Sequence, residues 1–325
     1  MKTMKNLSAV HGIAGLTLFF LIGLSSFTFA QEYPTRPITL YCPFPAGATV
    51  DIVARGLATG AEKILGVPVL VENKTGGLGT LCAALLASQK PDGYTISVLA
   101  TGVMTYIPLL YKVSYKPLDA FTPVMQFSKF IGGLSVLSES PFKTVNDLIE
   151  YAKTHPGLTY GSPGKNSFHH LNVELFSQCK GLNLKHIPYK GGSETIPALL
   201  GKHIDLHAGS AHIPYVQQGK LRLLMVYSAT KRDPLFPDVP TLVELGCQEY
   251  PGDGMMVAGP KGLPEPIVKK LNSAFKKVAE DQEFQKLLVR LNLPYTYKDG
   301  EELNKEAPAE VEYYKNLNKK LGIDK

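Results

Sequence analysis

The sequence predicts an α/β protein built as two lobes around a cleft. Short apolar segments rich in β-branched residues alternate with helical patterns through most of the chain, as in folds with largely parallel strands. About 295 residues follow an N-terminal apolar segment, which suggests two lobes rather than a single sheet. Hydrophobic residues make up 44% of the chain and charged residues 19%, a composition that excludes disorder.

The first thirty residues (1–30) are predicted to be a secretory signal peptide. Lys2 and Lys5 precede the apolar run 13–24, and a small-residue end places the cleavage site before Gln31. The run is too short to span a bilayer comfortably, and no second apolar segment of spanning length follows. The mature protein is therefore expected to be soluble and periplasmic, with a retained N-terminal anchor as the alternative.

The charge distribution argues against a nucleic-acid partner. Lys2 and Lys5 are the only charges of the signal segment, so its removal lowers the formal net charge from +6 by two. The chain has no basic block, no nucleic-acid-binding motif and no aromatic residues interleaved with basic ones. A mildly basic protein is compatible with a small anionic ligand.

Seven segments carry the strand pattern. They are 38–42, 67–71, 94–100, 158–161, 184–189, 204–208 and 221–228. A helix is predicted over 51–65, because Val53, Leu57 and Ala61 share one face and Gly66 stops it.

Further helices are predicted in the rest of the chain, and they replace the alternation of strands and helices toward the C-terminus. One spans 145–153, with Thr144 and Asp147 as its cap. After Pro264 we expect helices only, over 265–292 and 301–320.

Two crossings between the lobes are predicted. They fall near Gly132-Gly133 and near 251–254, so that the first lobe is discontinuous. Lobe 1 is expected to comprise 31–132 and 252–325, and lobe 2 to comprise 133–251. Two connecting segments form a hinge, as in a clamshell that closes on a ligand.

Four glycine-rich turns follow predicted strands and precede helices. They read PFPAGATVD from Pro43, ENKTGGLGT from Glu72, SPGKNSFHH from Ser162 and PYKGGSE from Pro188. Such turns gather at the carboxyl edge of parallel sheets, where ligands bind. Each helix start offers free backbone N–H groups and the positive end of a dipole, which suit a carboxylate or phosphate. GGLG does not complete a dinucleotide fingerprint, so no nucleotide cofactor is predicted.

The ordered set of motifs resembles one family of binding proteins. PFPAG, PDGYT, PYKGG and DVPT occur in order over nearly the whole mature chain. This combination resembles the substrate-binding proteins of tripartite tricarboxylate transporters, the Bug or TctC family. The resemblance implies a periplasmic binding protein of the type II, Venus-flytrap fold, without a cofactor. It further implies a monomer that delivers a small organic carboxylate to the membrane components of such a transporter.

The resemblance also implies where the ligand lies. In the family it is held in the interlobe cleft by backbone amides, hydroxyls and ordered water rather than by an arginine. The matching positions from the first lobe are Phe44, Ala46, Gly47, Ala48, Thr49, Asn73, Gly76, Gly77, Gly79 and Thr101. Those from the second lobe are Ser162, Gly164, Ser167, His170, Tyr189, Lys190, Gly191 and Asp205.

Those positions give a hypothesis for the binding mode. The carboxylate nearest the hinge is received by the amides of 46–49 and 76–79, and the second lobe closes over it with Ser162, Ser167 and Tyr189. A second polar end of the ligand reaches His170 or Lys190.

The chain departs from the family pattern within the loops that contact the ligand. Ala48 and Val50 replace residues of the usual PFPAGGxTD, and Thr49 is the remaining hydroxyl beside Asp51. Leu78 and Cys82 stand at usual glycine positions. The identity of the ligand therefore stays open.

Three other functions are alternatives to carboxylate delivery. The pattern of His203, Asp205 and His207 could suggest a metal site, but the two histidines of a strand would lie roughly 13 Å apart. A serine hydrolase would need Ser162 or Ser167 activated by a histidine, yet no GxSxG surrounds either serine. Catalysis is therefore not expected. A receptor that reports to a membrane sensor kinase would have the same binding chemistry and stays an alternative.

The four cysteines leave the redox state open. Cys42, Cys82, Cys179 and Cys247 allow three pairings for two disulfides, with buried free thiols as the alternative.

Overall fold

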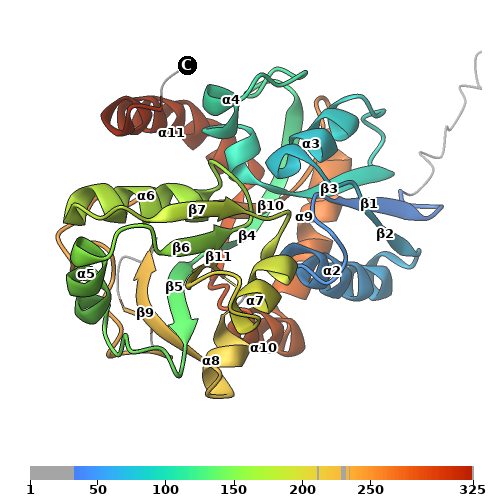
Figure 1. The fold of residues 1–325 in the computed structure, drawn as a ribbon. Coiled ribbons are helices and arrows are strands. Elements are labelled where there is room, and N and C mark those ends of the chain that lie inside the picture. The colour runs from blue at the N-terminus through green and yellow to red at the C-terminus, as the bar shows by residue number, and fades with distance from the viewer. Residues whose placement is uncertain (1–32, 211, 228–231, 234, 324–325) are drawn as a thin grey trace, which may run out of the picture. The chain divides into compact units, whose positions relative to one another are not determined.

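Two β-sheets, each flanked by helices, organise the chain (Figure 1). The structure is a computed structural model that describes residues 33–323, apart from 211, 228–231 and 234. Residues 36–325 form one compact unit. The first sheet has the strand order β11-β4-β10-β3-β1-β2, and the second has the order β7-β6-β8-β5-β9.

The strands of each sheet come from defined parts of the chain. The first sheet contains β1 (Ile38–Cys42), β2 (Val69–Asn73), β3 (Thr95–Ala100), β4 (Phe121–Lys129), β10 (Gly254–Pro260) and β11 (Tyr295–Asp299). The second contains β5 (Gly132–Leu137), β6 (Thr159–Ser162), β7 (Lys185–Pro188), β8 (Leu206–Gly209) and β9 (Leu221–Tyr227). β1 is parallel to β2 and β3, and β6 is parallel to β7 and β8, so their carboxyl ends lie at one edge of each sheet.

The helices follow the strands. Those associated with the first sheet are α2 (Thr49–Leu65), α3 (Thr80–Ala87), α4 (Ile107–Leu110), α9 (Glu265–Glu280), α10 (Gln282–Arg290) and α11 (Gly300–Leu321). The helices that lie between strands of the second sheet are α5 (Val145–Thr154), α6 (Phe168–Lys180), α7 (Gly192–Leu200) and α8 (Ile213–Gln217). Short 3₁₀ turns cover Gly77–Gly79 and Thr101–Val103. None of the described helices is long and apolar enough to cross a membrane.

The α/β prediction is confirmed, and most predicted elements are found within two residues of their expected ends. The capping box predicted at Thr144 and Asp147 is present, with each side chain bonded to the other residue's backbone. The expectation of helices only after Pro264 is wrong, because β11 pairs with β4 there. The long helix predicted over 265–292 is also divided, since Asp281 caps a new helix.

Three further strands carried no clear signal. β4 contains Pro123 yet lies between β10 and β11. Because proline cannot donate to a ladder, it is tolerated here near an irregularity in the β4–β10 pairing. β10 begins and ends with glycine and proline, which read as turns, and β5 begins with two glycines.

The chain passes between the sheets twice. It leaves β4 at Lys129 for β5 at Gly132, and it returns between Tyr227 and Gly254. The lobe boundaries predicted at 132/133 and 251/252 lie near these passages and stay a prediction. The predicted signal segment lies outside the described residues.

The cysteines divide into one disulfide and two free thiols. Cys179 and Cys247 are bonded, which links the end of α6 to the segment before β10. Cys42 and Cys82 are buried and free. One disulfide therefore forms, and the other two cysteines remain buried free thiols.

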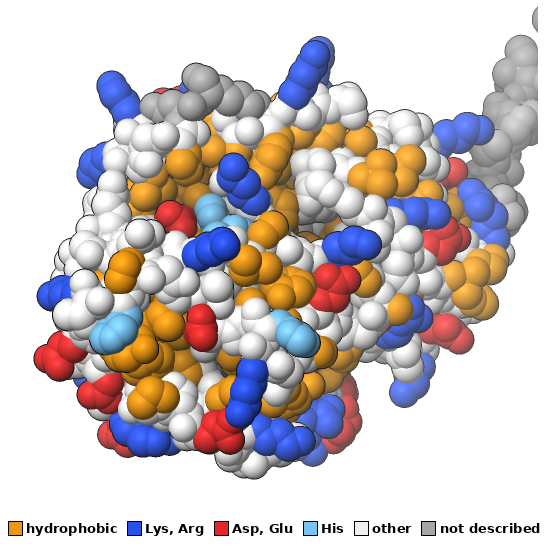
Figure 2. Space-filling view, viewed as in Figure 1, with side chains coloured by type: hydrophobic (Ala, Val, Ile, Leu, Met, Phe, Trp, Pro, Cys, Tyr) orange, Lys and Arg blue, Asp and Glu red, His pale blue; other side chains and the backbone are white. Residues whose placement is uncertain are grey.

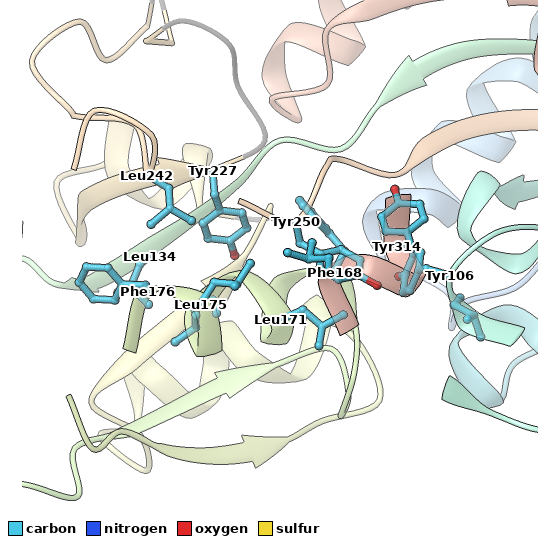
Figure 3. Close-up of a cluster of buried hydrophobic side chains, with 14 of the residues drawn as sticks. Tyr106, Leu134, Phe168, Leu171, Leu175, Phe176, Tyr227, Leu242, Tyr250 and Tyr314 are labelled. Atoms are coloured by element: carbon cyan, nitrogen blue, oxygen red, sulfur yellow. The ribbon is translucent and has the colours of Figure 1, made fainter. Parts of the chain in front are cut away.

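Aromatic side chains from distant segments pack together near the second passage between the sheets. Tyr106, Tyr250 and Tyr314 lie close together beside Phe168 (Figure 3). The ring centroids of Tyr106 and Tyr250 are 5.3 Å apart, and those of Tyr250 and Tyr314 are 5.0 Å apart. Because Tyr314 belongs to α11, which packs on β4 of the first sheet, and Phe168 begins α6, which packs on β8 of the second, the cluster connects the two parts of the chain.

Candidate functional site

A cavity lies between the carboxyl edges of the two sheets. About 700 Å³ of space is free of protein atoms there, a volume that includes open solvent. Residues that follow the strands of the first sheet line one side: Phe44, Ala48, Thr49, Val50, Leu78, Ala100, Tyr106, Ile107 and Asp253. Phe130 lies at the passage, and the second side is lined by Pro163, Ser167, Phe168, His169, Gly191, Gly192 and Ser210.

Helix α2 points its N-terminus at this cavity. Its cap residue, Ala48, offers no side-chain acceptor. The N–H groups of Thr49 and Val50 have no acceptor among the described residues, and both residues line the cavity. The helix therefore presents free donors and the positive end of its dipole to the cavity.

Two more helices begin at the opposite wall. In α6 the Ser167 hydroxyl accepts from the N–H of His170, as the sequence suggested for a cap. The N–H of Phe168 keeps no acceptor within the described chain. In α7 the cap is Gly191, which has no side chain, and Gly192 likewise keeps a free N–H among the described residues. Donors from three helices thus face one cavity.

The turn after β1 is held by a buried carboxylate. Asp51 is 3% exposed and accepts from the backbone N–H of Gly47 at 2.9 Å and from Asn73 Nδ2 at 2.8 Å. Burial alone would raise the pKa of Asp51, but these hydrogen bonds and that of Arg55 lower it below its usual value.

That arrangement corrects the hypothesis for the amides of 46–49. The N–H of Gly47 already binds Asp51, and the N–H of Ala48 donates to Pro45 O at 3.1 Å. Neither is available to a ligand, so the free donors begin at Thr49. Gly47 adopts φ +79°, which explains the glycine by turn geometry. Ala46, Gly47 and Asn73 do not line the cavity.

Most of the turn after β2 lines a neighbouring groove rather than this cavity. Leu78 is the member of this turn that reaches the cavity, whereas Gly79 donates its N–H to Gly76 O. The groove also contains several other predicted site residues: Phe44, Gly76, Gly77, Gly79, Gly164, Tyr189 and Lys190. At its rim the Tyr111 hydroxyl donates to Lys165 O at 2.8 Å, which joins the two sides.

Four other predicted positions have structural partners. Ser162 is fully buried, and its hydroxyl lies 2.7 Å from His186 Nε2. His170 packs on His186 and lies outside the cavity lining, so it does not meet a ligand there. The Asp205 carboxylate accepts from Thr159 at the start of β6, at the edge opposite the cavity.

The Thr101 hydroxyl is also occupied by hydrogen bonds within the protein. Its hydroxyl donates to the Asp253 carboxylate at 3.1 Å and accepts from the N–H of Gly254 at 2.9 Å. Thr101, Ser162, His170 and Asp205 are thus not among the residues that line this cavity, and their role as ligand-binding residues stays a prediction.

Asp253 is a cavity residue that the sequence did not reveal. Its carboxylate is 5% exposed and accepts from the N–H of Gly102 at 2.5 Å and from the Tyr106 hydroxyl at 3.2 Å. Burial raises its pKa to about 6. In sequence it lies in a PGDG turn, 151 residues from Gly102, so no local pattern connects it with the site.

His169 is a second titratable group of the cavity, beside Asp253 and Tyr106. Its Nδ1 lies 3.1 Å from the Tyr227 hydroxyl, and its Nε2 lies 3.5 Å from Ser210 Oγ. Burial lowers its pKa to about 3, so it is neutral near pH 7. His169 stands next to His170 in SPGKNSFHH, and the sequence alone does not show which of the two histidines reaches the cavity.

The cavity contrasts with the outer surface in charge. Figure 2 shows basic, acidic and apolar side chains interspersed over the visible face. Among the described residues that line the cavity, none is Lys or Arg. The described residues also contain no group of three or more His, Cys, Asp or Glu side chains placed to hold a metal ion. An anion bound here would be held by backbone donors.

Comparison with known proteins assigns the chain to a family. The model of the "Tripartite tricarboxylate transporter family receptor" matches residues 53–323. A relative from Cupriavidus necator, the "UPF0065 protein in gbd 5'region", is 39% identical over 324 residues, which are 99% of this chain and 98% of the relative.

Solved structures show the same fold. The periplasmic binding protein BugD has a TM-score of 0.83 and 32% identity, over 90% of this chain and 99% of BugD. The R. palustris protein Rpa4515, solved with adipate, has a TM-score of 0.83 and 29% identity, over 90% of this chain and 99% of that protein. These neighbours are binding proteins with a two-lobed fold, not enzymes. The chain belongs to the tripartite tricarboxylate transporter receptors, the TctC or Bug family.

Proposed function

We propose that the protein captures a small organic carboxylate in the cavity between its sheets. It then delivers this ligand, from the periplasm, to the membrane components of a tripartite tricarboxylate-type transporter. The observation that carries the proposal is the convergence of free N–H groups from α2, α6 and α7 on one cavity. The adipate bound to Rpa4515 supports the ligand class, since adipate is an organic carboxylate.

The binding mode follows from those donors. A carboxylate placed at Thr49 and Gly192 would accept from two helices that begin on opposite sides of the cavity. Each helix adds the positive end of its dipole, which stabilises an anion without a basic side chain. Because the donors come from both sides, the bound carboxylate would hold the two sides together.

Calorimetry on protein refolded from denaturant, to remove carried-over ligand, tests the capture. A panel should contain dicarboxylates, tricarboxylates, aromatic acids, amino acids and neutral analogues. The proposal requires that at least one acid binds while its neutral amide or alcohol analogue does not. Binding of neutral compounds alone would contradict it.

A backbone variant tests the role of α2. Thr49→Pro removes one N–H at the first helical position, where proline is tolerated. The preceding residue, Ala48, has φ −71° and ψ 157°, which suits a following proline. We expect at least a tenfold loss of affinity, the effect of losing about one charge-assisted hydrogen bond.

Two controls accompany this variant. Gln282→Pro makes the same change at the first position of α10, after Asp281 with φ −66° and ψ 140°, and should leave affinity unchanged. Thr49→Val keeps the N–H and removes only the hydroxyl. Equal affinities of the wild type and Thr49→Pro would show that the α2 N-terminus does not bind the ligand.

Delivery needs a separate test. Uptake of the identified acid should depend on this protein in cells that carry the membrane components. Uptake that persists without it would contradict the delivery step while leaving capture intact.

A further inference from the structure

The cavity has one end rich in free donors. Gly191 follows β7 and Pro45 follows β1, and a Cβ on Gly191 would lie 3.9 Å from Pro45 Cδ. The turns after these two strands therefore face each other. Helices α2 and α7 begin here, with the free N–H groups of Thr49 and Gly192.

The other end lies at the passage between the sheets. In the first sheet β3 separates β1 from β10, so the start of β10 is about 10 Å from β1, two strand spacings away. Asp253 directly precedes β10, and its carbonyl accepts from the N–H of Phe130 at 2.8 Å. On the second side, the Ser210 hydroxyl donates to Ile131 O at 2.8 Å. Asp253, Phe130 and Ser210 thus mark the far end.

The far end carries an acceptor in place of a second set of donors. One oxygen of Asp253 accepts from Gly102 and Thr101, whereas the other accepts only from the Tyr106 hydroxyl among the described residues. A carboxylate oxygen can accept more than one hydrogen bond. The charged or titratable groups that act on Asp253 are tyrosines and Glu310, so no cation among the described residues neutralises it.

Apolar walls connect the two ends. Val50, Ile107 and Phe168 line the cavity together with the rings of Tyr106 and Phe130. A flat apolar body fits such walls, and aromatic neighbours favour a ring. A second ionised carboxylate at the far end would meet the like charge of Asp253.

We propose that the ligand is a monocarboxylic acid whose ring-sized apolar body carries a hydroxyl at the end away from the carboxylate. The carboxylate binds at Thr49 and Gly192, and the hydroxyl donates to Asp253. This inference rests on the proposed function and narrows the class of acid. It separates this protein from Rpa4515, whose structure contains the dicarboxylate adipate.

Calorimetry at pH 7.5 with 4-hydroxybenzoate, benzoate and adipate tests the inference. We expect 4-hydroxybenzoate to bind about tenfold more tightly than benzoate, because a hydrogen bond to a charged acceptor has about that effect. Adipate should bind more weakly than benzoate. Adipate binding as tightly as 4-hydroxybenzoate would overturn the inference while supporting the proposed function.

Asp253→Asn tests whether Asp253 causes this preference. Asparagine keeps an oxygen that can accept from Gly102 and Thr101 but removes the charge. The preference for 4-hydroxybenzoate should fall to about threefold or less, since neutral hydrogen bonds are roughly half as strong. The affinity for adipate should rise relative to benzoate.

A charge-matched control variant and a comparison of affinity ratios complete the experiment. Asp119→Asn removes an exposed carboxylate that pairs with Lys261 away from the cavity, and it should leave all three affinities unchanged. Because ratios of affinities are compared within each variant, a general loss of stability cannot imitate the result. An unchanged preference in Asp253→Asn would overturn the inference. Failure of every acid in the wider panel would instead contradict the proposed function.

Discussion

The Asp51 carboxylate accepts a hydrogen bond of 2.9 Å from the backbone N–H of Gly47, four residues earlier. The same carboxylate binds Asn73 after β2 and pairs with Arg55. One buried side chain therefore connects the turn after β1, the end of β2 and the first turn of α2. Since α2 supplies the donors at Thr49, this network positions the site.

Asp51→Ala should destabilise the protein and weaken binding together. Removing the Asp51 carboxylate leaves the N–H of Gly47 without its acceptor and leaves Asn73 Nδ2 with Phe44 O alone, so we expect the free energy of unfolding to fall by about 2–4 kcal/mol. Urea denaturation and calorimetry measure the two effects. Arg55→Ala is the control, because its side chain is 51% exposed and its loss should cost less than about 1 kcal/mol. Equal costs for the two variants would contradict the assigned role of Asp51.

Gly47→Ala should affect binding through backbone geometry. A Cβ at Gly47 would meet nothing within 4 Å, but its φ of +79° is unfavourable for alanine. We expect a loss of about 1–2 kcal/mol in the free energy of unfolding. Gly66 at the other end of α2 has φ +72° and equally open space, so Gly66→Ala is a matched control. Both variants should lose similar stability, and only Gly47→Ala should lose affinity. If both bound ligand like the wild type, the turn would not position the site.

Leu78 and Gly164 should be coupled across the groove beside the cavity. Leu78 has φ +55°, and a Cβ on Gly164 would lie 3.0 Å from Leu78 Cδ2. Gly164→Ala should therefore weaken ligand binding by opposing this approach of the two sides. Leu78→Ala in the same chain should recover part of the affinity, with a coupling of about 1 kcal/mol in a double-mutant cycle. Additive effects would show that this contact is not part of closure.

Four buried histidines and the half-buried His186 should make the protein sensitive to acid. Burial lowers the pKa of His169 and His170 to about 3 and of His186 and His212 to about 4, and it lowers that of His207 well below the usual value. The pKa of each histidine is lower in the folded state than in the unfolded state. The stability that depends on its neutral form is therefore fully present above about pH 6.5 and is lost as the pH falls through the folded pKa values. Each histidine can remove about 1.4 kcal/mol per pH unit within that window. Asp253 has the opposite effect on the pH dependence. Because its folded pKa is raised to about 6, its contribution to stability is lost as the pH rises toward that value.

Urea denaturation at pH 7.0 and 5.5 measures this loss. We expect the wild type to lose several kcal/mol and His212→Gln to lose about 1 kcal/mol less, because one fewer proton is taken up on unfolding. His203→Gln, at an exposed position, is the control for substitution itself. An equal pH dependence of the wild type and His212→Gln would contradict the prediction.

The sequence predicted most of the fold because its parallel strands are short, apolar and separated by capped helices. It missed β4 and β10, where Pro123 and the terminal glycines imitate turns and pairing between distant segments decides the structure. Local propensity has little power at such positions.

The turns of the site were also predictable, but the use of their N–H groups was not. Whether the amide of Gly47 faces a ligand or Asp51 depends on a side-chain rotamer that spacing does not determine. Asp253 was missed for a related reason, since its partners Gly102 and Tyr106 come from a loop about 150 residues earlier in the chain.

An NMR titration of the backbone amides tests the central claim that helix N-termini bind the carboxylate. The acid that binds most tightly in calorimetry should move the amide proton signals of Thr49 and Gly192 downfield, with saturation at the calorimetric Kd. The signals of Gly47 and Gly79 should change less, because their N–H groups already have protein acceptors. Shifts confined to the turn 76–79, with Thr49 and Gly192 unchanged, would contradict the claim.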